Sequence, residues 1–190
     1  MMRHLALAVL AAGCFVSCES NAPYLPVTHH EEAQFKLARL EVNPDDVRNN
    51  IDLYTNTTVA WAGVIRSTVA EENDFGGKIT AKSTFEHHYF DWAQNTDPAL
   101  NLLVSPRGEG SFACIWQLRK KTTEASAYDA EKFARNGKLA IVYGVPESVT
   151  PEGTIVLKYA YLRVVDRANF NTNTLNYGRL GVEPLHPAGQ

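Results

Sequence analysis

The middle and C-terminal parts of the chain alternate short apolar segments with turn-forming residues. In segment 57–68, TTVAWAGVIRST, both faces of an extended chain are largely apolar, which predicts a strand buried on two sides or bent around a barrel. Gly63 within this segment indicates a bulge or a sharp bend. Similar patterns predict further strands at 78–92, 101–118, 138–149 and 154–166. The chain is therefore expected to be mainly β.

One helix is expected within this series of strands, at residues 124–137 (EASAYDAEKFARNG), between the third and the fourth. Its expected buried side consists of Ala125, Tyr128, Ala130, Phe133 and Ala134. Asn136 and Gly137 are expected to end it through a left-handed cap.

Shorter elements are expected before the first strand. Residues 29–42 allow a short helix, part of which runs extended. Pro44 forces the preceding residue out of the helical region, so 43–46 is expected to form a turn or the start of a new helix. Residues 49–57 are expected to form a loop.

Five strands with one helix between the third and fourth is the element order of the OB-fold, a small closed Greek-key barrel. Closure of the sheet removes unpaired strand edges, which protects a protein from pairing with copies of itself. We therefore expect an OB-like five-stranded barrel domain at 43–170 and a loosely packed C-terminal tail at 171–190. A jelly roll or an open meander is the alternative β architecture.

The first residues, MMRHLALAVLAAGCFVSC, have the features of a bacterial export signal. Arg3 precedes an apolar run at 5–16, which is shorter than the about 20 residues needed to cross a bilayer. The run has the length of a signal-peptide core and is followed by small residues. Two cysteines, Cys14 in AAGC and Cys18 in FVSC, resemble the cysteine of a lipobox, which receives lipid and becomes the mature N-terminus.

Cys18 is the favoured lipidation site, because it leaves the fuller apolar core and is followed at once by a polar segment. Cys14 is the alternative, and a secreted protein cut after a small residue is the other interpretation of the leader. The expected organisation is a signal peptide at 1–17, followed by a tether and short N-terminal segment at 18–42. Neither Glu19 nor Phe15 is the aspartate that signals inner-membrane retention in enteric bacteria. An outer-membrane location facing the periplasm is therefore predicted.

The overall charge and the cysteines narrow the possible partners. The formal net charge is −3, so the surface lacks the clustered Lys and Arg that general nucleic-acid binding requires. No cysteine spacing resembles a zinc site. If Cys18 is acylated, Cys114 is left as a single thiol, and its aromatic and branched neighbours predict that it is buried and inert. If Cys14 is acylated, a bridge between Cys18 and Cys114 stays open.

An acylated leader followed by NPDDVRNNIDLYTNTTVAWAGVI resembles the Slp family of outer-membrane lipoproteins. The similarity is best over residues 43–66 and consists of an Asn-Pro turn, a short spacer and a strand ending in a Gly-Gly-x-Ile-like pattern. Ala62 stands where the first of these glycines is usual. The resemblance implies an OB-like barrel on a lipid anchor, and it brings no catalytic residues to this chain.

Segment 85–92, FEHHYFDW, is the strongest candidate for chemistry. On a strand, His87 and His88 face opposite sides and cannot share one metal ion. We interpret the segment as a strand with an aromatic packing face and polar positions pointing outward. The alternative is a metal-dependent envelope hydrolase that uses either histidine with Glu86 or Asp91.

Two other polar segments are interpreted structurally. HHEE, at 29–32, is expected to be a solvated polar linker, although His29 and Glu32 would share a face if it were helical. SPRGEG, at 105–110, lacks the Lys-Ser/Thr end and the strand-to-helix context of a phosphate loop and is expected to be a tight excursion within or before the third strand. Arg107 and Glu109 are expected to project from it into water.

OB barrels present ligands on their second and third strands and the adjoining loops. Tyr89, Trp92, Arg107 and Trp116 fall in or near that region, so they are the candidate ligand-binding residues. If the aromatic rings are buried, they fill the core instead.

The sequence as a whole predicts a non-catalytic lipid-anchored envelope protein with a structural or partner-binding role and no cofactor. Its expected partners are the membrane, through the lipid, and envelope proteins or cell-wall glycan. A glycan- or small-ligand-binding barrel and the metal-dependent hydrolase are the alternatives.

Overall fold

The computed structural model describes residues 24–73, 78–92, 103–119, 126–165 and 169–170 of the chain. Its helices are α1 (His29–Leu37), α2 (Pro44–Asn49), the 3₁₀ helix η1 (Ile51–Leu53) and α3 (Ala127–Phe133). Its strands are β1 (Val59–Asn73), β2 (Lys78–His88), β3 (Leu103–Val104), β4 (Ser111–Arg119), β5 (Leu139–Val149), β6 (Ile155–Val165) and β7 (Asn169–Phe170).

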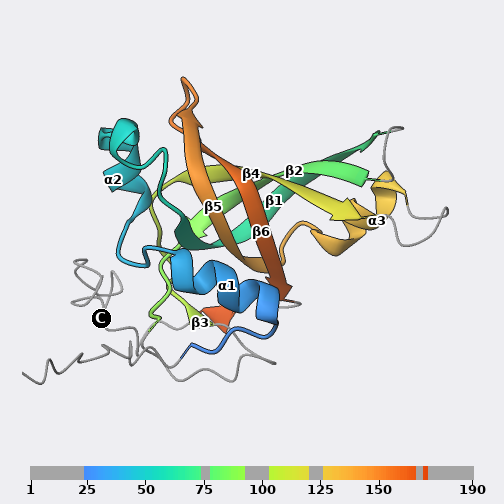
Figure 1. The fold of residues 1–190 in the computed structure, drawn as a ribbon, viewed down its shortest axis with the longest axis horizontal. Coiled ribbons are helices and arrows are strands. Elements are labelled where there is room, and N and C mark those ends of the chain that lie inside the picture. The colour runs from blue at the N-terminus through green and yellow to red at the C-terminus, as the bar shows by residue number, and fades with distance from the viewer. Residues whose placement is uncertain (1–23, 74–77, 93–102, 120–125, 166–168, 171–190) are drawn as a thin grey trace, which may run out of the picture.

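Five strands form a closed barrel in the order β1-β2-β4-β6-β5 (Figure 1). Its strands pair antiparallel except β4 and β6, which run parallel. α3 lies in the chain between β4 and β5, which are the third and fourth barrel strands. The predicted OB-like Greek-key barrel with one helix between its third and fourth strands is therefore confirmed.

Gly63 has a different role from the predicted one. The register between β1 and β2 shifts between Ile65 and Ser67, so the irregularity lies after Gly63. A Cβ atom at Gly63 would lie 2.9 Å from the backbone oxygen of Glu86 and 2.9 Å from the Phe112 ring. Gly63 thus lets the Phe112 ring pack closely against the backbone of β1.

The barrel wall is buried on both faces where β1 and β5 pair. The interior core contains side chains from every barrel strand, including Trp61, Ile65, Ile79, Phe85, Phe112, Cys114, Val142, Ile155 and Leu157. A second core lies outside the wall and contains Tyr24, Ala60, Ala62, Val64, Phe90, Trp92, Val104, Leu139, Ile141 and Tyr143. The prediction that the first strand is buried on two sides is confirmed. Cys114 is fully buried in the interior core, as predicted, and burial raises the pKa of its thiol.

The buried side of α3 was predicted only in part. Ala130 and Ala134 are fully buried, but Tyr128 is 68% exposed and Phe133 is 43% exposed. The helix is short, beginning at Ala127 and ending at Phe133, and besides its small residues only the half-exposed Phe133 ring reaches the barrel, 5.8 Å from the Trp116 ring by their centroids. Gly137 has a φ of +84° but lies in the turn that follows the helix, not at its cap. Ala125 lies outside the described residues.

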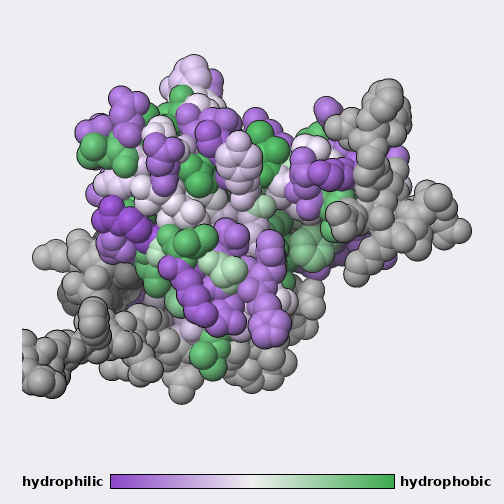
Figure 2. Space-filling view, viewed as in Figure 1, coloured by the Kyte–Doolittle hydropathy of each residue, from purple (hydrophilic) through white to green (hydrophobic). Residues whose placement is uncertain are grey.

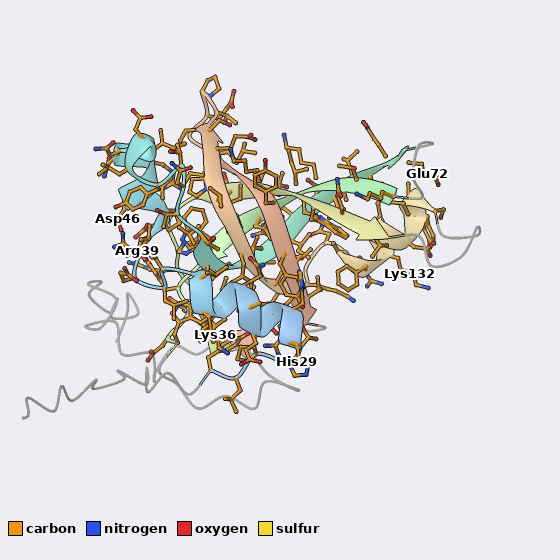
Figure 3. The ribbon with its side chains drawn as sticks, viewed as in Figure 1. His29, Lys36, Arg39, Asp46, Glu72 and Lys132 are labelled. Atoms are coloured by element: carbon orange, nitrogen blue, oxygen red, sulfur yellow. The ribbon has the colours of Figure 1, made fainter. Side chains whose placement is uncertain are left out.

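Short helices pack against the barrel at separate places: α3 lies against β1 and β2, and α1 lies against β6. Glu72 of β1 accepts a hydrogen bond from the backbone N–H of Ala127 at 3.0 Å and so caps the start of α3. Figure 3 shows Glu72 and Lys132 on the right of the view, where α3 lies, and His29 and Lys36 on α1 at the bottom. Glu32 lies within salt-bridge distance of His29 and of Lys36. This confirms that His29 and Glu32 share a face of α1.

A buried carboxylate fastens the N-terminal segment to the barrel. Glu31 of α1 is fully buried, and its carboxylate accepts hydrogen bonds from the hydroxyls of Tyr24 and Tyr143 and from the backbone N–H of Val27. The guanidinium of Arg163, on β6, lies 3.6 Å from this carboxylate. We call Tyr24, Glu31, Tyr143 and Arg163 the Glu31 cluster.

The Glu31 cluster changes the interpretation of the N-terminal region. The prediction of a solvated linker at 29–32 is wrong for Glu31, because α1 turns this side chain toward β5 and β6. Arg39 also pairs with Val59 of β1 in an isolated bridge. The described part of the segment before residue 43 therefore packs as part of the folded body.

Replacing Glu31 with alanine is expected to lower the free energy of unfolding by about 3 kcal/mol or more, because it removes the carboxylate that accepts hydrogen bonds from the buried hydroxyls of Tyr24 and Tyr143. Urea unfolding followed by tryptophan fluorescence measures this change. Glu32→Ala is the matched control on the same helix turn, and we expect it to leave stability nearly unchanged. Equal losses in the two variants would contradict the assignment of the Glu31 cluster.

Candidate functional site

The histidine segment lies at the end of β2, and its two imidazoles point to opposite sides of the strand, as predicted. The ring of His87 lies inside the barrel end, 6.3 Å from the rings of Trp61 and Phe112 by their centroids. The ring of His88 lies outside, with Nδ1 2.8 Å from the backbone oxygen of Ser105. Each histidine is 4% exposed. The expectation that the polar positions point into solvent is therefore wrong for these two residues.

Loop 105–110 buries the histidines because it pairs with the backbone at the end of β2. His87 donates to the oxygen of Gly110 at 2.9 Å, and Tyr89 donates to the oxygen of Arg107 at 3.1 Å. A Cβ atom at Gly108 would lie 1.8 Å from the backbone oxygen of His87. Glycine is thus required where the loop crosses the strand. The predicted third strand is divided here into β3 and β4.

The hydrogen bonds set the protonation of both rings. The backbone N–H of Glu109 donates to Nδ1 of His87 at 2.9 Å, so the proton of this neutral ring resides on Nε2. Nδ1 of His88 faces a carbonyl oxygen and therefore carries the proton. Burial, with smaller contributions from His88 and Arg48, lowers the pKa of His87 to about 3. Burial also lowers the pKa of His88.

Helix α2 closes the barrel end beside His87. Asp45 donates its backbone N–H to the carboxylate of Glu109 at 2.8 Å, and the hydroxyl of Tyr89 donates to the same carboxylate. Arg48 donates to the backbone oxygens of Glu109 and Gly153. Glu109 was expected to project into water, but it links the loop to the helix. Burial and the Glu109 carboxylate raise the pKa of Tyr89.

This arrangement gives the histidine segment a structural role. The two rings cannot reach a common ion because the β2 backbone separates them. In the part of the chain that the structure describes, no group of three or more His, Cys, Asp or Glu side chains is placed to hold a metal ion.

The four predicted ligand-binding residues do not share one surface. Trp116 points into the barrel and donates its indole N–H to Ser83 at 2.9 Å. Trp92 belongs to the outer core, where its ring contacts that of Tyr24. Tyr89 is 7% exposed, and Arg107 alone of the four is exposed. The three aromatic rings are therefore buried in the protein. This is the outcome expected above for rings that do not bind a ligand.

A groove lies on the barrel where β4 and β6 separate. The two strands pair only from Phe112–Cys114 to Ile155–Leu157. Beyond this seam β4 runs toward α3 and β6 runs toward α1 (Figure 1). The groove has a volume of about 470 Å³ and is lined by Ile115, Trp116, Gln117, Glu147, Lys158, Tyr159 and Ala160.

Tyr159 is the most unusual residue of this groove. Its φ is +53°, and among the described residues no other non-glycine residue has a positive φ. It lies where the register between β5 and β6 shifts, so the chain bulges there. Its side chain is 82% exposed. The sequence does not indicate this conformation, because segment 154–166 has the pattern of an ordinary strand.

Charged groups lie next to the Tyr159 ring. The ammonium of Lys158 is 5.6 Å from the ring centroid and 3.9 Å from the carboxylate of Glu147. Elsewhere on the surface, exposed large apolar side chains lie mainly on separate elements, as with Leu37 of α1 and Val69 of β1. On the face drawn in Figure 2, the hydrophobic residues form separate green areas among hydrophilic ones.

No family model matches the chain, and no curated protein matches it significantly. The resemblance to the Slp family stays a prediction from residues 43–66. No helix in the described ranges is both long and apolar enough to span a bilayer.

The low pKa of His87 predicts a loss of stability in mild acid. Between pH 6.5 and 3 the unfolded chain binds a proton at this residue that the folded chain does not. The effect of His87 on the free energy of unfolding is therefore absent above pH 6.5. As the pH falls below this value, the free energy of unfolding decreases by up to about 1.4 kcal/mol per pH unit. Urea unfolding at intervals from pH 7 to 5 measures this slope.

The variant that tests the assignment is His87→Asn, whose side-chain oxygen can accept the Glu109 N–H and does not titrate. Its free energy of unfolding is expected to vary less with pH than that of the native protein. His29→Asn, on the exposed side of α1, is the matched control and is expected to keep the native slope. An unchanged slope in His87→Asn would show that His87 is not the titrating group.

Proposed function

We propose that this protein is a non-catalytic lipoprotein of the bacterial outer membrane, with its OB-like barrel facing the periplasm and serving envelope structure or binding a partner. The leader and the cysteine at its end carry this proposal. The similarity of residues 43–66 to the Slp family supports the same role. The structural use of the histidine segment supports a role without catalysis.

The proposed lipidation site is only a few residues from the folded body, so a lipid there would restrain the position of the barrel. Tyr24 is 1% exposed and is hydrogen-bonded to Glu31, so the chain is fixed to the body at this residue. Only residues 19–23 separate it from Cys18. Each residue extends the chain by at most about 3.6 Å, so Cys18 lies within roughly 20 Å of Tyr24. An acylated Cys18 would hold the barrel close to the bilayer.

The same geometry supports one orientation of the barrel relative to the proposed membrane. Tyr24 packs near α1, whose Phe35 ring is 5.4 Å from its own. In Figure 1 the turn between β5 and β6 lies at the opposite end of the view from α1. The α1 side would therefore face the membrane, and the β5–β6 turn would project into the periplasm.

The proposal requires acyl chains on the native N-terminus, because each buried methylene adds about 0.8 kcal/mol of membrane affinity and several chains are needed for stable anchoring. Mass spectrometry of the protein from a bacterial host with an outer membrane is expected to find an acylated N-terminal residue at Cys18. Cys18→Ser is expected to lose the lipid and leave the membrane fraction.

Cys14→Ser is the matched control and should still be acylated at residue 18. If the roles of the two variants are exchanged, Cys14 is the lipidation site and the anchor itself stands. A native N-terminus without acyl mass would refute the proposed function.

A further inference from the structure

We propose that the groove between β4 and β6 binds a neutral saccharide chain, with the Tyr159 ring as its stacking platform. The saccharide is the ligand class for the partner-binding role proposed above. The inference rests on that proposed function, because it assumes that the protein meets cell-wall or envelope glycan.

Stability does not account for tyrosine at position 159. A residue with a Cβ atom is disfavoured at a φ of +53°, and glycine would adopt this conformation without steric cost. The ring is 82% exposed, so it gains little from burial. Strained backbone of this kind is concentrated at ligand-binding sites, where the position of one side chain matters. What tyrosine adds here is a flat, accessible ring beside the groove.

The polar groups of the groove suit a ligand rich in hydroxyls. Glu147 and Lys158 carry opposite charges 3.9 Å apart, so together they add no net charge to the site. Their oxygens and N–H groups, with the amide of Gln117, can accept and donate hydrogen bonds. An anionic polymer would need an excess of basic side chains, which this groove lacks among its lining residues.

The apolar groups suit the C–H faces of sugar rings. Ile115 is 38% exposed on the β4 side, and Tyr159 faces the groove from the β6 side. The volume of about 470 Å³ is within the range of about 300–1,000 Å³ for small-ligand sites. The site is a groove between diverging strands and not an enclosed cavity. A chain of sugars can therefore enter it without being engulfed.

The test is a calorimetric titration of the full-length protein in detergent micelles with three neutral tetrasaccharides, of β-1,4-linked N-acetylglucosamine, β-1,4-linked glucose and α-1,4-linked glucose. At least one is expected to bind. Tyr159→Gly is expected to weaken that binding by roughly tenfold, from the loss of aromatic stacking. The same variant is expected to unfold at the same urea concentration as the native protein or a higher one, because glycine relieves the strained φ.

Tyr128→Ala is the matched control, since Tyr128 is also an exposed tyrosine but lies on α3. It is expected to keep native affinity. Absence of binding to all three sugars, or native affinity in Tyr159→Gly, would overturn the proposal.

A second measurement tests a different occupant, an unstructured peptide that adds a strand to β4 where β4 no longer pairs with β6. Changes in the backbone NMR signals of Ile115 and Gln117 caused by such a peptide, and not by the sugars, would overturn the saccharide assignment.

The outcome is separable from that of the proposed function. An acylated N-terminus with no saccharide binding would refute the groove assignment and leave the lipoprotein intact. Saccharide binding by a chain without lipid would do the reverse.

Discussion

The outer faces of β1 and β5 carry Ala62, Leu139, Ile141 and Tyr143, which water would contact if the barrel stood alone. Exposure of a continuous apolar wall is unfavourable, by roughly 25 cal/mol for each Å² of apolar surface left in water. The chain covers this wall with two segments that flank the barrel strands, the one that leads into β1 and the one that follows β2. The barrel therefore needs these two covering segments for its stability, and they belong to the same folded unit.

Covering the wall brings polar groups into the interface, and these fix its geometry. A buried carboxylate is costly unless it is paired and hydrogen-bonded, and Glu31 meets both conditions through Tyr24, Tyr143 and Arg163. Such a group tolerates few alternative placements of α1, whereas apolar contacts alone would allow it to slide. Under the proposed anchoring at Cys18, a pull on the lipid would reach the barrel through Tyr24, which is the first described residue of the covering segment and is hydrogen-bonded to Glu31.

The parts of the structure that follow from local pattern were predictable, and the parts that depend on distant partners were not. The two-sided apolar character of residues 57–68 and the alternation at His87 and His88 are local properties, and both are confirmed. The burial of Glu31 depends on Tyr143, which is 112 residues away in the sequence. The exposure of Tyr128 depends on how α3 meets β1. Of the residues that line the groove, the sequence indicated only Trp116, whose ring packs in the interior core while the residue also lines the groove.

The groove and the strain at Tyr159 are two consequences of one irregularity. β6 pairs with β4 in parallel only up to Leu157, and the register between β5 and β6 shifts at the next residues. A bulge increases local twist and bends the strand, so β6 turns away from β4 where the bulge occurs. The bend opens the seam of the barrel, and the left-handed residue that permits it carries the exposed ring at the edge of the opening. A regular β6 would close the seam and would also remove the ring from its position, so the site and the strain exist together or not at all.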